Sequence, residues 1–153
     1  IIRVTGKLGG SLLSGSHLSF EPRVREGSWL RSHVNAMIDI SDGLASELWH
    51  LADESAAHLI LDPSTVPFSE AARGTDDPLA HALHDGEDFE LLFTLSESED
   101  LSFDSRWQEA FPNLPCTRIG RVASHGTASV TTPDGTSIPR SGFDHFSSPL
   151  VSP

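Results

Sequence analysis

The pattern that most constrains the fold is a change of hydrophobic period within AMIDISDGLASEL, residues 36–48. The first five residues have the apolar character of a buried strand, whereas Leu44, Leu48 and Leu51 recur at the spacing of one helix face. Glu47 is expected to point away from that face. Residues 57–62 then read as a second strand. This order predicts a crossover that joins two parallel neighbouring strands.

Further strands and helices alternate along the rest of the chain. Strands are predicted at residues 1–6, 87–95 and 117–123, helices at 78–84 and 103–111, and a hairpin with a Pro-Asp-Gly turn at 128–138. Because the two kinds of element are interspersed, the fold class is α/β or α+β with a layered sheet.

Bulk properties restrict the partners and the compartment. A length of 153 residues suits one domain, and a formal net charge of −12 argues against nucleic-acid and anionic-lipid partners. A single cysteine excludes an intrachain disulfide and a four-cysteine zinc site. With no signal peptide and no apolar run of membrane-spanning length, the cytoplasm is the expected location. A chain that opens on Ile1 is expected to be a fragment or a processed protein.

Two acids mark the junction between the first predicted strand and its helix. Asp39 and Asp42 flank Ser41, and either Ser41 or Asp42 stands where a helix N-cap is expected. Capping accounts for one acid, but a second carboxylate near an apolar strand end is costly without a partner. The pair therefore has two interpretations, a capped helix or a metal or ligand site.

Two other stretches carry candidate chemistry. HDGEDFELLFT, residues 84–94, places four acids around the start of a strand, and it reads as a solvated turn or as a cation or polar-ligand site. TGKLGGS, residues 5–11, has glycines after a strand that could offer amides to a phosphate, although a plain turn is favoured and no Walker motif is present.

Taken in order, six motifs resemble one family. VTGKLGGS, HLSFEPRVREG, AMIDISDGLASEL, GEDFELLFT, TRIGRV and SGFDHF follow each other as in the C-terminal domain of thiamine-monophosphate kinase, a member of the aminoimidazole ribonucleotide synthetase-like superfamily. The resemblance implies an α+β sandwich with a mixed sheet packed with helices. It implies a domain over residues 1–146 and a flexible tail over 147–153. The resemblance further implies that the family's N-terminal domain lies outside this chain.

The resemblance also implies a reaction and a set of site residues. The family phosphorylates thiamine monophosphate to thiamine diphosphate with ATP, by in-line transfer assisted by Mg²⁺. Asp39 and Asp42 match Mg²⁺ ligands, Ser41 an ATP contact, Glu87 a substrate contact and Phe143 an aromatic residue against thiamine. No catalytic residue is assigned. The parent protein is expected to be a homodimer, and the chain alone to be inactive.

Several positions depart from the family pattern. Asp85 replaces a usual glycine, Phe89 a usual tyrosine and Ser19 a usual arginine, and the segment between Leu12 and His17 is shortened. Two alternatives therefore stay open, namely another ATP-using member of the superfamily and a degenerate stand-alone binding or interaction domain.

Overall fold

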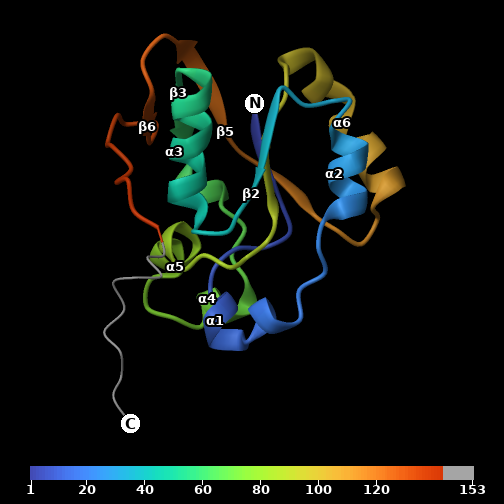
Figure 1. The fold of residues 1–153 in the computed structure, drawn as a ribbon, viewed down its shortest axis with the longest axis vertical. Helices are drawn as coiled ribbons and strands as arrows, with labels where there is room; N and C mark the ends of the chain where they lie inside the picture. Colours follow the sequence, from blue (N-terminus) through green and yellow to red (C-terminus); the bar gives the residue numbers. More distant parts are fainter. Residues whose placement is uncertain (143–153) are drawn as a thin grey trace.

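The computed structural model describes residues 1–142 (Figure 1). Its strands are β1 (Ile2–Thr5), β2 (Ala36–Asp39), β3 (Ala57–Leu61), β4 (Leu91–Thr94), β5 (Cys116–His125) and β6 (Ser129–Thr131). Its helices are α1 (Ser11–Ser14), α2 (Val24–Leu30), α3 (Leu44–Ser55), α4 (Glu70–Arg73), α5 (Pro78–His84) and α6 (Glu97–Ala110), with 3₁₀ turns η1 (Ser16–Leu18) and η2 (Pro63–Thr65). The helices predicted at 78–84 and 103–111 are confirmed, although α6 starts six residues earlier.

The six strands form one mixed sheet in the order β2-β4-β1-β5-β3-β6. Every neighbouring pair is antiparallel except β3 and β6, which are parallel. The prediction that β2 and β3 are parallel neighbours is wrong, because β4, β1 and β5 lie between them. Hydrophobic period reports which face of a strand is buried, but it does not report which later segment will pair with its edge.

Helices cover both faces of this sheet. Ile2 and Val4 of β1 belong to a core with α3 and α5, whereas Phe93 of β4 belongs to a second core with α2 and α6. Figure 1 shows α3 on one side of the strands and α2 and α6 on the other. A mixed sheet packed with helices is the predicted fold class, which is confirmed. Across the described residues, every helix is too short or too polar to cross a lipid bilayer.

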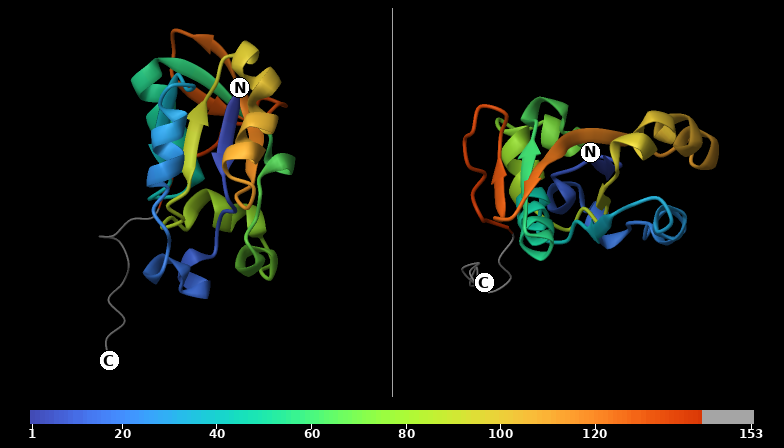
Figure 2. Two further views of the ribbon diagram at one scale, coloured as in Figure 1. Left: turned by 90° about the vertical axis from the view of Figure 1, so that its right-hand side faces the viewer. Right: turned by 90° about the horizontal axis from the view of Figure 1, so that it is seen from above.

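Strand direction brings three separate loops to one end of the sheet. Strands β1 and β2 both run antiparallel to β4, so the ends of β1 and β2 lie beside the beginning of β4. The loops at these points are residues 6–10, 40–43 and 85–90, which we call the loop end. Figure 2 shows α1, α4 and α5 gathered below the strands at this end.

The strand predicted at residues 87–95 is only partly correct. Regular pairing covers Leu91–Thr94 alone, and the preceding residues form a loop in which Glu87 and Phe89 have φ angles of 59° and 51°. Positive φ is uncommon for residues other than glycine, and it breaks the alternation that a strand requires. The loop therefore turns side chains of the GEDFEL motif toward the end of the sheet.

Candidate functional site

The corner between β2 and α3 carries the two acids of the first motif. Asp39 is exposed at the last position of the edge strand β2, and Asp42 is half-buried just before the helix. The N-cap position is Gly43, with φ 105° and no side-chain hydrogen bond, so the predicted cap by Ser41 or Asp42 is wrong. Within residues 1–142, neither acid's carboxylate accepts a hydrogen bond or forms an ion pair.

Glu47 supplies the polar contact that was expected from a cap. Its Oε1 accepts the backbone N–H of Asp42 at 3.2 Å and the Ser41 hydroxyl at 3.3 Å. The side chain is 2% exposed, so the expectation that it faces solvent is wrong. Burial raises the pKa of Glu47, while the Asp42 amide opposes that rise. The sequence did contain a signal for this burial, because Glu47 shares one helical stripe with Leu44, Leu48 and Leu51.

The loop at residues 85–90 docks on this corner through its backbone. The Glu87 amide donates to the Ser41 carbonyl at 2.6 Å, and the Phe89 amide donates to the Ile40 carbonyl at 2.9 Å. At Gly86, φ is 70° and an added Cβ would lie 2.5 Å from the Ser41 carbonyl oxygen. Only glycine permits this approach. The two stretches that the sequence singled out are therefore in contact.

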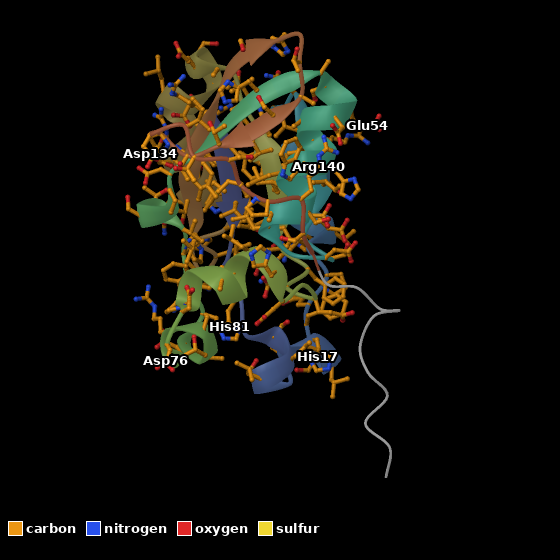
Figure 3. The ribbon with its side chains drawn as sticks, turned by 90° about the vertical axis from the view of Figure 1, so that its left-hand side faces the viewer. His17, Glu54, Asp76, His81, Asp134 and Arg140 are labelled. Atoms are coloured by element: carbon orange, nitrogen blue, oxygen red, sulfur yellow. The ribbon has the colours of Figure 1, made fainter. Side chains whose placement is uncertain are left out.

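The glycine-rich loop, residues 6–10, contacts the 85–90 loop through its backbone amides. Both carboxylate oxygens of Asp88 accept the Gly9 amide, at 3.0 and 2.9 Å, and Asp85 accepts the Gly10 amide at 2.9 Å. His81 lies 2.8 Å from the same Asp85 oxygen, and Figure 3 labels it on α5. These two amides bind acids of the chain itself, so the phosphate-cradle interpretation does not describe them.

Asp88 is the acid most perturbed by its surroundings. Burial raises its pKa from an ordinary 3.8 to about 7, and the neighbouring charges of Asp85 and Glu90 add to the rise, while the Gly9 amide opposes it. The group can therefore hold or release a proton near neutral pH. Sequence reasoning placed Asp88 within an acidic turn without distinguishing it from its neighbours.

A buried ion pair anchors the segment before α2 to the same loop. Arg23 donates to both oxygens of Glu90, at 2.8 and 2.6 Å, and the Thr5 hydroxyl donates to Glu90 at 2.6 Å. The hydrogen bonds to Glu90 raise the pKa of Arg23. Phe20 stacks on Phe89 with ring centroids 3.9 Å apart. Arg23 lies within the HLSFEPRVREG motif, but the sequence did not predict its pairing with Glu90.

These contacts surround a cavity of about 350 Å³. Most of its lining comes from three segments, residues 6–9, 16–23 and 87–90, and includes Lys7, Phe20, Arg23, Glu87, Asp88 and Phe89. Its walls combine stacked aromatic rings with charged groups of both signs. Such a mixed lining suits a small molecule that has an apolar ring and a charged group.

Four of the five predicted site residues belong to the described part of the chain. Asp39, Ser41, Asp42 and Glu87 all lie at the loop end. Phe143 lies outside the described residues. At Gly142, the last described residue, an added Cβ would lie 2.6 Å from the Asp42 carbonyl oxygen. Over residues 1–142, no three His, Cys, Asp or Glu side chains are grouped so as to hold a metal ion. Asp39 and Asp42 alone therefore do not form a metal-binding cluster within these residues.

Comparison with known proteins supplies relatives for this arrangement. No family model matches the chain. The thiamine-monophosphate kinase of Rhodopirellula baltica is 42% identical over 127 residues, which are 78% of this chain and 38% of the relative. The crystal structure of the thiamine-monophosphate kinase from Stenotrophomonas maltophilia K279a superimposes with a TM-score of 0.74 and 31% identity, over 89% of this chain and 50% of that one.

A further solved structure, AaThiL complexed with AMPPCP and TMP, matches with a TM-score of 0.68 and 28% identity, over 95% of this chain and 50% of its own. The chain thus spans about half the length of the relatives it matches, or somewhat less. The sequence motifs, their meeting at the loop end and the matched relatives all indicate the same family. The chain belongs to the thiamine-monophosphate kinase family and corresponds to its C-terminal domain.

Proposed function

We propose that this chain supplies one half of the active site of an enzyme that transfers a phosphoryl group from ATP to thiamine monophosphate. The observation that carries the proposal is the meeting of three separate motifs at the loop end, where two carboxylates without partners in residues 1–142 stand beside the cavity-lining loop. The solved relative that holds AMPPCP and TMP supports the same assignment. We also propose that the rest of the active site lies in another half of the same protein, and that this domain spans residues 1–146. The whole protein is proposed to be a homodimer in the cytoplasm.

The donor set at the corner is compatible with Mg²⁺. Carboxylate oxygens are the hard ligands that this ion prefers, and the ion usually takes only one or two of them, with water and phosphate oxygens completing its shell. Asp39 and Asp42 are the residues that would hold it. When bound, the ion would offset the negative charge of the phosphates that meet there.

The remaining residues of the chain bind and orient. Ser41 is held by the Glu87 amide and by Glu47, so its position beside the acids is fixed before any nucleotide arrives. Glu87 lines the cavity and would contact the acceptor, and Phe143 would contact the thiamine ring. A positioned acceptor is the main requirement of phosphoryl transfer, because little covalent chemistry is left for the protein.

A hybrid enzyme tests this assignment. Residues 1–153 would replace the matching segment of the Rhodopirellula kinase, and formation of thiamine diphosphate would be measured. Asp39→Asn and Asp42→Asn should each lower kcat/KM by about a hundredfold and raise the Mg²⁺ concentration needed, because each removes a charged ligand. Asp134→Asn is the control, since Asp134 is an exposed turn residue far from the loop end (Figure 3).

The same variants separate function from folding. Because neither carboxylate has a partner in the described chain, both substitutions should change the free energy of unfolding by less than about 0.5 kcal/mol. Full turnover by a folded Asp39→Asn, Asp42→Asn double variant would contradict the proposed function.

A further inference from the structure

Exposed apolar side chains are concentrated in one short segment next to the cavity. Of the six large apolar side chains that are exposed in residues 1–142, five lie between positions 12 and 24: Leu12, Leu13, Leu18, Phe20 and Val24. We call these five residues the apolar segment. Exposed apolar side chains that gather in one part of a surface are typical of interaction sites.

The apolar segment is held firmly against the loop end. The Ser11 hydroxyl donates to the Gly86 carbonyl at 2.6 Å, and Phe20 stacks on Phe89. The Arg23–Glu90 pair fixes the other end of the segment beside α2. In Figure 1 this part of the chain runs from α1, under the sheet, up to α2. These contacts fix the apolar segment in place with its five apolar side chains exposed.

From this we infer that the apolar segment is the surface on which the amino-terminal half of the kinase docks. The inference rests on the proposed function only for the identity of that partner. The matched kinases are about twice as long as this chain or longer, so a domain-sized partner lies outside it. The loop end also needs further ligands, because its two free carboxylates fall short of a metal site among residues 1–142. A second copy of this chain would add no new kind of ligand.

Docking at this surface would also close the cavity. Phe20 belongs to the apolar segment and to the cavity wall. A domain that covers the apolar segment would therefore contact Phe20 in the cavity wall and exclude water from that side of the cavity. The same contact would join the two halves and complete the binding site.

Hydrogen–deuterium exchange tests the inference without a turnover assay. The 153-residue chain would be compared with the hybrid kinase described above. Amides of residues 12–24 should exchange at least about tenfold more slowly in the hybrid, because the docked half buries them. The peptide around Leu101, which is 91% exposed on α6, should exchange equally in both proteins. Equal exchange at residues 12–24 would overturn the inference.

Co-expression of the chain with the separate amino-terminal half of the Rhodopirellula kinase gives a second measurement, should the hybrid not fold. Leu13→Asp and Leu18→Asp should each weaken the complex by about tenfold or more, whereas Leu101→Asp should leave it unchanged. Equal effects of Leu18→Asp and Leu101→Asp would overturn the inference. So would light scattering that shows a dimer of this chain whose formation is blocked by Leu13→Asp. Binding with no turnover would keep the surface and contradict the proposed reaction instead.

Discussion

Two arginines, Arg3 in strand β1 and Arg23 just before helix α2, form similar ion pairs in opposite settings. Arg3 is the buried partner of its network, with 5% of its side chain exposed, and it contacts Asp100 and Asp104 on the rim of α6. In the Arg23 pair the acid is the buried member, because Glu90 is 8% exposed and Arg23 is 21% exposed. The charge that must be compensated is thus a cation in one region and an anion in the other.

The surroundings explain the difference. Arg3 lies 4.7 Å from the ring centroid of Phe103, within the aromatic layer formed by Trp29, Phe103 and Trp107 between α2 and α6. Glu90 instead lies beside a cavity, among loops that are held by backbone amides. In the aromatic layer the ion pair packs against the core. At the loop end the ion pair lies beside a cavity and near two carboxylates that have no partner within residues 1–142. Stability should therefore depend mainly on the first region and ligand binding on the second.

The largest effect is expected in the aromatic layer. Phe103→Ala should lower the free energy of unfolding by about 3 to 5 kcal/mol, because it leaves a cavity and removes the ring beneath Arg3. Urea denaturation followed by Trp fluorescence measures the change. Leu101→Ala, on the same helix but fully accessible, should cost less than about 0.5 kcal/mol. A loss below about 1 kcal/mol for Phe103→Ala would mean that the layer does not hold the fold together.

A pH effect of intermediate size is expected at the loop end. Asp88 has a pKa of about 7 in the folded chain, against an ordinary 3.8. Between about pH 4 and pH 7 the unfolded chain has lost this proton while the folded chain keeps it, so stability falls as pH rises through that window. The loss should be about 2 kcal/mol, less than full burial would give, because the side chain is only half-buried.

Asp88→Asn isolates this contribution. The amide oxygen can still accept the Gly9 N–H, but the side chain cannot ionise. Stability measured at several pH values should therefore decline less between pH 4 and pH 7 in the variant than in the parent. Asp76→Asn, which changes an exposed acid, should follow the parent curve. Parallel curves for Asp88→Asn and the parent would show that Asp88 ionises normally.

Local pattern identified the elements but not their pairing. The helical stripe from Leu44 to Leu51 predicted α3, because hydrophobic period is a local property of the sequence. The position of β2 at a sheet edge depends on β4, a segment more than fifty residues later. No local signal encodes that choice.

Sequence motifs identified residues of the candidate site, but they did not predict its geometry. The acids at 39 and 42 stood out because a carboxylate at a strand end needs a reason. Glu47 lies on the apolar stripe of α3, and this position indicates burial. The prediction that it faces solvent considered only the polarity of its side chain. The positive φ angles at Glu87 and Phe89 could not be predicted, since they arise from backbone contacts with Ile40 and Ser41 across the sheet end.

The smallest expected effect tests that backbone contact by comparing two glycines. Gly86 and Gly15 have φ angles of 70° and 74°, so alanine at either position carries the same left-handed strain of about 1 kcal/mol. At Gly15 an added Cβ meets no atom of the described chain within 4 Å, whereas at Gly86 it meets the Ser41 carbonyl oxygen at 2.5 Å. Gly86→Ala should therefore cost about 1 kcal/mol more than Gly15→Ala in urea denaturation. It should also weaken Mg·ATP binding by the hybrid kinase, because it displaces Ser41 and Asp42 from the 85–90 loop. Equal costs for the two variants would show that the loops can separate without loss, and the loop end would then lack the preorganised geometry on which its proposed role depends.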